Sequence, residues 1–328
     1  MIDISICMVS LNCWPVLQDC LESLRASSSS VSHEIIIVDN GSTDGIAAWL
    51  LENYPDVKFV ENGRNAGFTR GTNQAIALSS GRFLLWLNTD TILRPDSLAK
   101  LVEWMDAKPR TGIVGPKVLN PDGGFQPQCR RGLPTPLASL SYYLHLDRLW
   151  PNNPALGQYL QTHLPIDQPC QVAAVSGCCL LARREVYTQI GPLDEEIFAF
   201  GEDIDWCVRA ENAGWEVWYN PESVITHLKG QGGVHSKPFG KIRGMHHGMW
   251  VFYRKHLRAK YSWPVSWLMT PLVIGGIAVS FGFASLRVWA SRLRPSRQSP
   301  RGEQTLQTLG EIGTAQENAQ ITVRTDQK

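Results

Sequence analysis

Short apolar runs alternate with helical patterns along the first 120 residues, and this alternation limits the possible folds more than any other feature of the chain. The run EIIIVDN at residues 34–40 is apolar almost throughout, as expected of a parallel strand covered on both faces. Residues 14–27 carry apolar side chains at helical spacing. This order predicts a right-handed, mostly parallel α/β sheet. The expected strands are 4–12, 34–40, 57–62, 82–90 and 111–119, and the expected helices are 14–27, 44–54, 70–80 and 95–107.

The pattern changes in residues 120–170, where Pro, Gly and Asn are frequent and periodicity is weak. We interpret this part as an insertion over one rim of the sheet. Regular patterns return at residue 171, with a strand and a helix up to residue 191. Residues 202–214 predict a short helix that Gly214 closes, and strands follow it up to residue 227.

The segment GEDIDW, residues 201–206, crowds Glu202, Asp203 and Asp205 between two aromatic residues. Acidic residues are favoured in the first turn of a helix, so capping alone would explain the cluster. The alternative is a catalytic base whose pKa is adjusted by its neighbours. The cluster by itself favours capping.

Polar side chains also gather where the predicted strands end. Because ligands of open α/β sheets bind beyond the carboxyl ends of the strands, these side chains should lie on one rim. An aspartate there can accept hydrogen bonds from a nucleobase or a ribose, or bind Mg²⁺ or Mn²⁺. The alternative is that each group only forms a turn or caps a helix. The residues are Ser10, Asn12, Asp39, Asn40, Ser42, Arg64, Asn65, Gly67, Asn88 and Asp90.

Composition excludes several classes of protein. The 31 Lys and Arg residues nearly balance 30 Asp and Glu residues, so nucleic acid is not an expected partner. The eight cysteines are scattered without a CxxC pair, which indicates reduced cysteines in a cytosolic protein. Neither a GxGxxG fingerprint nor a P-loop is present, which argues against an oxidoreductase and a P-loop enzyme. The N-terminus lacks the pattern of a signal peptide.

Residues 262–286 contain no charged residue and have Arg and Lys on both sides. Their number suits a bilayer span of about 20 residues, although Pro264, Pro271 and the Gly275-Gly276 pair interrupt the run. We expect residues 258–294 to form a membrane-associated segment that spans, re-enters or lies on the bilayer, with a buried helix as the alternative. The polar residues 295–328 are expected to be a disordered tail.

The motifs together resemble the inverting glycosyltransferases of family 2, which have the GT-A fold. The resemblance covers roughly residues 4–257, and it implies that residues 1–257 form one GT-A domain. Residues NTD, GEDID and an RR pair before a proline-containing loop are most similar to the rhamnosyltransferase-like branch. The motifs that carry the resemblance are SICMVSLN, VDNGSTDG, RNAGF, LNTD, GPKVL, the run from SGCCLLARREVYTQIG through GEDIDWCVRAENAGW, and His227.

The resemblance implies a role for each matching residue. Asp39 would contact the base and ribose of the donor, and Asn65 and Gly67 would form the turn beside the nucleotide. Asp90 would bind a divalent cation, Mg²⁺ or Mn²⁺, and His227 can complete its shell or be an ordinary histidine at a strand end. Asn88 stands where the family's DxD motif has its first aspartate, which weakens the metal site by one carboxylate.

The acidic cluster gains a function from the same resemblance. Asp203 would be the base that takes a proton from the acceptor hydroxyl as it displaces the nucleoside diphosphate with inversion. Glu202 would bind an acceptor hydroxyl, and Asp205 would support the start of the helix. Trp206 would shape the acceptor face or, equally, belong to the core.

The implied activity is transfer from a nucleotide sugar, with dTDP-L-rhamnose as one candidate, to a hydroxyl of a lipid-linked or cell-surface glycan. The expected location is the cytoplasmic face of the cell membrane. Two alternatives remain open: a polyprenyl-phosphate glycosyl synthase, which would depend less on Asp203, and a nucleotide-sugar-binding module without turnover, because Asn88 departs from DxD.

Overall fold

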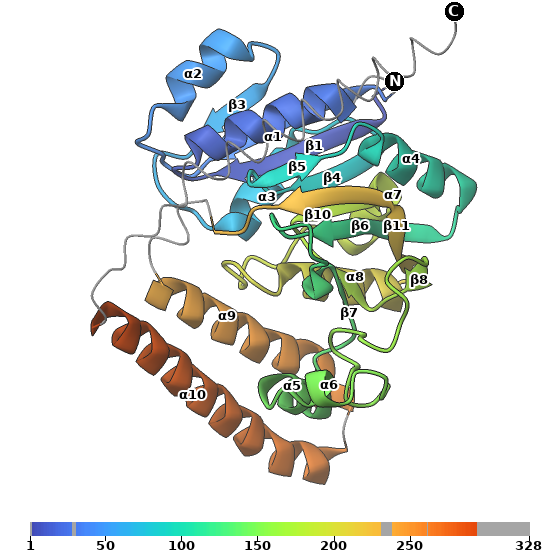
Figure 1. Ribbon diagram of the computed structural model, residues 1–328, viewed down its shortest axis with the longest axis vertical. Helices are drawn as coiled ribbons and strands as arrows, with labels where there is room; N and C mark the ends of the chain where they lie inside the picture. The colour runs from blue at the N-terminus through green and yellow to red at the C-terminus, as the bar shows by residue number, and fades with distance from the viewer. Residues whose placement is uncertain (1, 28–30, 231–237, 261, 294–328) are drawn as a thin grey trace, which may run out of the picture. The chain divides into compact units, whose positions relative to one another are not determined.

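The computed structural model describes residues 2–27, 31–230, 238–260 and 262–293. Within these residues the strands are β1 Ile4–Ser10, β2 His33–Asp39, β3 Lys58–Glu61, β4 Phe83–Leu87, β5 Thr91–Leu93, β6 Thr111–Leu119, β7 Arg130–Arg131, β8 Cys170–Gln171, β9 Ala174–Val175, β10 Cys179–Arg183 and β11 Glu216–His227. Nine of these described strands form one sheet in the order β3-β2-β1-β4-β10-β6-β11-β5, with β8 paired to β11 (Figure 1). Strands β7 and β9 form a separate small sheet.

Helices cover both faces of the large sheet (Figure 1). The chain steps outward from β1 to β3 and then returns to β4, so right-handed crossovers put α1 and α2 on one face and α3 on the other. The helices are α1 Trp14–Ser27, α2 Ile46–Asn53, α3 Phe68–Ala77, α4 Ser97–Ala107, α5 Pro136–Tyr143, α6 Leu146–Leu149, α7 Arg184–Ile190, α8 Glu202–Asn212, α9 Pro238–Phe252 and α10 Trp263–Leu293, with short helical turns at η1 Pro127–Cys129, η3 Tyr253–Leu257 and η4 Arg258–Lys260.

The predicted mostly parallel α/β sheet is confirmed. Strands β3, β2, β1 and β4 pair in parallel, as do β6 and β11. Strand β10 differs, because it runs antiparallel to both of its neighbours, β4 and β6. The short strand β5 was not predicted, and it pairs antiparallel with the end of β11.

The C-terminal part contains one long apolar helix among the described residues. The chain divides into two compact units, Met1–Ser285 and Leu286–Lys328, so most of α10 belongs to the first unit. There α10 packs on the preceding helices, with Ser280 Oγ 2.9 Å from His246 Nε2 and Thr270 Oγ1 3.1 Å from the Tyr253 hydroxyl. By length and composition α10 could cross a bilayer. The predicted polar tail, residues 295–328, lies outside the described residues.

Trp206 of α8 lies in the core of the first unit. Its side chain is 0% exposed, and the centroid of its indole ring lies 4.9 Å from that of Trp86 in β4. The indole N–H donates to the backbone oxygen of Gly191 at 3.0 Å. Trp206 therefore joins α8 to the sheet. Of its two predicted places, it occupies the core and not the acceptor face.

We expect Trp206→Ala to lower the free energy of unfolding by about 3–5 kcal/mol, because a large buried ring leaves a cavity. Chemical unfolding followed by fluorescence measures this. Leu51→Ala is the control, since Leu51 is 70% exposed on α2 and should change stability by less than about 0.5 kcal/mol. Unchanged stability in Trp206→Ala together with a raised KM for an acceptor would restore the binding role.

Candidate active site

Asp39, the last residue of β2, holds the turn after that strand together. Its Oδ1 accepts hydrogen bonds from the hydroxyls of Ser10 at 2.8 Å and Ser42 at 2.5 Å. Its Oδ2 accepts the backbone N–H groups of Gly41 at 2.9 Å and Ser42 at 2.7 Å. The Ser42 hydroxyl oxygen also accepts the N–H of Asn12 at 2.8 Å. Four donors fill the acceptor positions of Asp39, so a ligand must replace one hydroxyl to bind this carboxylate.

Gly67 allows a close contact between the turn before α3 and the loop before α8. It has φ of +97°, and a Cβ there would lie 2.8 Å from the ring of Phe198. The side-chain oxygen of Asn65 accepts the Gly67 N–H at 3.0 Å, and the amide of Asn40 donates to the Gly67 oxygen at 3.1 Å. The glycine is thus required for packing against Phe198, a reason that differs from the predicted approach of a ligand to the backbone.

Strand β5 brings Asp90 next to His227. Thr91 and His227 are register partners in the β5–β11 pair, and Oδ1 of Asp90 lies 3.1 Å from Nε2 of His227. Nδ1 of His227 lies 3.1 Å from Oε1 of Gln126, an atom that only accepts, so Nδ1 carries a hydrogen. Burial acts to lower the pKa of His227, but Cys178 and the Asp90 carboxylate outweigh it and raise that pKa above its ordinary value.

The Asp90–His227 pair fits a hard divalent cation such as Mg²⁺ or Mn²⁺. A carboxylate oxygen is a suitable ligand, and Nε2 of His227 becomes one when it gives up the proton that it shares with Asp90; Gln126 then supplies the outer hydrogen bond that orients a metal-binding histidine. Among the described residues no group of three or more His, Cys, Asp and Glu side chains gathers to hold a metal ion. With two side chains bound to it, the cation would have its other coordination positions open to oxygens of a bound substrate and to water. Asn88 adds no negative charge.

Asp203 is held in the first turn of α8 by three donors. Nη2 of Arg131 forms an ion pair with Oδ2 of Asp203 at 2.6 Å, and the Gly177 N–H donates a hydrogen bond to the same oxygen at 2.9 Å. Oδ1 of Asp203 accepts the backbone N–H of Ile204 at 2.8 Å. A carboxylate oxygen can accept two hydrogen bonds, so Oδ1 keeps one position for another donor, such as a hydroxyl group.

Glu202 is buried beside Asp203, and one of its two carboxyl oxygens is unpaired within the part of the chain that the structure describes. Its Oε2 has no hydrogen-bond partner among the described residues. Burial, and then the charge of Asp203, raise the pKa of Glu202 to about 8. At neutral pH this carboxyl group is mostly protonated and can donate a hydrogen bond.

The turn before Glu202 has an unusual backbone that helix α9 contacts closely. Phe200 has φ of +70° and Gly201 has φ of +108°, so two left-handed residues precede the first turn of α8. A Cβ on Gly248 of α9 would lie 2.0 Å from the carbonyl oxygen of Phe200. Glycine at position 248 therefore lets α9 pack directly on the backbone that leads into Glu202 and Asp203.

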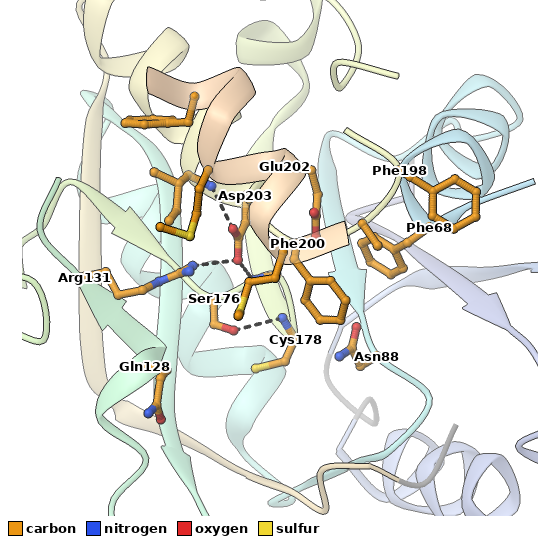
Figure 2. Close-up of a pocket in the computed structure, with 18 of the residues that line it drawn as sticks. Phe68, Asn88, Gln128, Arg131, Ser176, Cys178, Phe198, Phe200, Glu202 and Asp203 are labelled. Carbon is orange, nitrogen blue, oxygen red and sulfur yellow. Dashed lines mark hydrogen bonds and ion pairs between the residues drawn. The ribbon is translucent and has the colours of Figure 1, made fainter. Parts of the chain in front are cut away.

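A cavity of about 470 Å³ is lined by some of these groups, and Figure 2 shows Glu202, Asp203 and Asn88 among them. The predicted residues that line it are Asn40, Asn65, Asn88, Asp90, Glu202, Asp203 and His227. The described residues that were predicted for the site and do not line it are Ser10, Asn12, Asp39, Ser42, Arg64, Gly67 and Trp206. Half of the predicted residues thus share one cavity, while Ser10, Asp39 and Ser42 bond one another in the turn after β2.

Sequence reasoning missed part of the cavity wall. Arg131 was noted only as one half of an RR pair, and nothing local indicates its contact with Asp203. The aromatic side chains come from the aperiodic insertion and from the loop before α8, where no pattern separates a cavity wall from an ordinary loop. The additional residues are Gln126 behind His227 and, in the wall itself, Arg131, Tyr142, Tyr143, Tyr159, Phe198 and Phe200.

Comparison with known proteins defines the class to which this fold and cavity belong. The model of glycosyl transferase family 2 matches residues 5–191, more than half of the chain. The chain belongs to glycosyltransferase family 2 and is a glycosyltransferase.

Two curated relatives show which glycosyltransferases this chain is similar to. The N-acetylglucosaminyl-diphospho-decaprenol L-rhamnosyltransferase of Mycobacterium tuberculosis is 31% identical over 271 residues, which cover 78% of this chain and 85% of that protein. The low-salt glycan biosynthesis hexosyltransferase Agl10 of Haloferax volcanii is 26% identical over 58% of this chain and 57% of that protein.

Solved structures agree on the GT-A fold. A mannosyltransferase from Pyrobaculum calidifontis in complex with GDP-Man and Mn²⁺ has a TM-score of 0.53 at 16% identity, over 95% of this chain and 79% of that chain. GalNAc-T7 with UDP, GalNAc and Mn²⁺ has a TM-score of 0.51 at 17% identity, over 70% of this chain and 43% of that chain. At these identities the likeness shows the fold alone.

We expect Glu202→Gln to remove the alkaline decline of the transfer rate. Wild-type activity should fall as the pH rises through about 8, because the neutral acid loses its proton and with it a hydrogen-bond donor. Glutamine keeps a donor at every pH, so the variant should stay within a few-fold of wild type at neutral pH and show no such decline. Initial rates across this pH range measure the difference. The same decline in both proteins would show that Glu202 is not the group that titrates.

Proposed function

We propose that this glycosyltransferase moves a hexosyl residue from a nucleotide-diphosphate sugar to a hydroxyl of a lipid-linked glycan, with inversion at the anomeric carbon. The first donor to test is dTDP-L-rhamnose. The observation that carries the proposal is that one cavity contains both Asp203, with an open acceptor position on Oδ1, and Asp90 beside His227. The name of the M. tuberculosis relative, which specifies L-rhamnosyl transfer to N-acetylglucosaminyl-diphospho-decaprenol, supports the donor and acceptor classes.

In the proposed reaction, Oδ1 of Asp203 accepts the proton of the acceptor hydroxyl. The hydroxyl oxygen bonds to the anomeric carbon while the bond from that carbon to the diphosphate oxygen breaks, and the nucleoside diphosphate leaves with the electron pair. One displacement inverts the configuration. Arg131 and the Gly177 N–H hold Oδ2, so they orient Oδ1 for this transfer. Glu202, in its neutral form, donates a hydrogen bond to the acceptor.

The donor would occupy the polar side of the cavity. Asn40, Asn65 and Asn88 line the cavity, and behind them Ser10, Asp39 and Ser42 hold the turn after β2. Asp90 and His227 would hold Mg²⁺ or Mn²⁺, which would neutralise the charge that develops on the departing diphosphate.

The membrane part of the proposal rests on α10. Its large side chains are mostly exposed, including Trp263 and Trp267 at 79% each, and such a surface is unusual on a soluble monomer. Arg258 and Lys260, just before α10, are exposed and suit anionic headgroups. We propose that α10 holds the catalytic unit at the cytoplasmic face of the membrane, where a lipid-linked acceptor is available.

We expect Asp203→Asn to reduce turnover by about 10²–10⁴-fold while donor affinity stays near that of wild type, because the general base is lost. Transfer assays and calorimetric donor titration measure the two effects. Asp167→Asn is the control, since Asp167 is 82% exposed and pairs only with Lys117 among the described residues. Turnover near wild type in Asp203→Asn would contradict the assignment and favour the polyprenyl-phosphate synthase, which depends less on a base.

We expect Asp90→Ala to weaken donor binding about tenfold or more when Mg²⁺ or Mn²⁺ is present, because the bridge between carboxylate, cation and diphosphate is lost. With a chelator, the variant and wild type should bind the donor equally. Asp96→Ala, which removes a surface pair with Lys100, serves as the control. If wild type binds the donor with the same affinity with and without metal, Asp90 is not a metal ligand.

A further inference from the structure

Helix α5 presents opposite faces to two different surroundings. Thr135 caps it, with its hydroxyl oxygen accepting the Ala138 N–H at 3.2 Å. One face turns to the catalytic cavity, which Ser139, Tyr142 and Tyr143 line. The other face is apolar and exposed, and its side chains are spaced as on one side of a helix. These residues, which we call the leucine face, are Leu137 at 55% exposure, Leu140 at 55% and Leu144, just after the helix, at 57%.

The surroundings of the leucine face are also apolar. The sequence from Gly132 to Leu146 contains no Asp, Glu, Lys or Arg. After the buried Asp147 and the exposed Arg148 come Leu149 and Trp150, exposed by 66% and 55%. Exposed apolar side chains are ordinary when scattered singly, but a contiguous set marks a surface that binds another apolar surface.

Helix α5 reaches α9 and α10 through Tyr143, which is three residues after Leu140 and so neighbours the leucine face on the helix surface. The Tyr143 hydroxyl lies 3.3 Å from Sδ of Met249 in α9 and also hydrogen-bonds the side chain of Ser280 in α10. Side chains of α5, α9 and α10 therefore meet around Ser280 within the first compact unit, and Figure 1 shows α5 beside α9. Val279 and Phe283, beside Ser280, are 60% and 65% exposed.

We propose that the leucine face is a second bilayer contact that enters the boundary between headgroups and acyl chains next to α10. The occupant is lipid rather than a protein partner, because the face neighbours Tyr143, which hydrogen-bonds a helix that is long and apolar enough to cross a bilayer. Tyr142 and Tyr143 then lie between the bilayer and the cavity, at a depth that suits tyrosine. The inference rests on the proposed function: it places the cavity beside the lipid that carries the acceptor.

A fluorescent label tests the contact directly. The full-length protein carries Leu140→Cys with an environment-sensitive dye, and Leu51→Cys on α2 is the matched control at 70% exposure. Unsubstituted protein gives the background, which should be small because seven of the eight cysteines are buried. Vesicles of phosphatidylethanolamine and phosphatidylglycerol should shift the emission of the label at position 140 to the blue, and lipid-borne quenchers should reach it, with no change at position 51. No shift at position 140, or a shift that grows with protein concentration without vesicles, overturns the proposal, the latter in favour of a protein contact.

Activity provides the second test. In the triple variant Leu137→Gln, Leu140→Gln and Leu144→Gln, KM for a lipid-linked acceptor in vesicles should rise at least about tenfold. The rate with a short-chain, water-soluble acceptor should stay within about twofold of wild type, as should both rates for Leu51→Gln. An equal loss on both acceptors in the triple variant would mean that the leucine face only supports the cavity, and the proposal would be dropped. If wild type uses neither acceptor, the proposed function fails, while the dye experiment still decides on the membrane contact.

Discussion

The buried ion pair between Arg131 and Asp203 is the contact on which the cavity depends. The two side chains are only 11% and 10% exposed, and truncating either to alanine would leave the other charge buried without its partner, at a cost of about 3–5 kcal/mol, whereas asparagine at position 203 would keep an acceptor for Arg131. The pair ties the insertion to α8. The neighbouring Arg130 anchors the return of the insertion, donating to the backbone oxygens of Pro165 at 2.6 Å and Leu164 at 2.7 Å. Two adjacent arginines thus connect the catalytic helix and the insertion that closes over it.

Three acids that are neighbours in the sequence reach three different environments. Asp203 has an arginine and two backbone donors, and Glu202 is buried with one carboxyl oxygen unpaired among the described residues. Asp205 lies 2.6 Å from Nε2 of His256 and 2.9 Å from Nε of Arg209. Burial acts to raise the pKa of Asp205, but these two side chains outweigh it and lower that pKa. The three acids therefore divide between two places: Asp205 fastens α8 to η3, and Glu202 and Asp203 line the cavity.

The parallel core could be predicted because its strands are continuous apolar runs and its helices repeat with a helical period. The same rules miss β5, which has three residues, and the antiparallel direction of β10, which no local pattern encodes. The role of Arg131 depends on a partner 72 residues away. Trp206 was ambiguous because α8 is buried on most of its faces, so the helical pattern does not separate its cavity side from its core side.

The close packing at Gly248 limits where a chimera of this protein can be joined. Since α9 touches the carbonyl oxygen of Phe200 at a position where only a hydrogen fits, the backbone before the catalytic acids and the helix leading toward α10 have complementary shapes. His256 extends the same attachment by its contact with Asp205. A chimera that takes its C-terminal region from another glycosyltransferase must therefore join after residue 260 and retain α9, or import a helix with glycine at this point of contact.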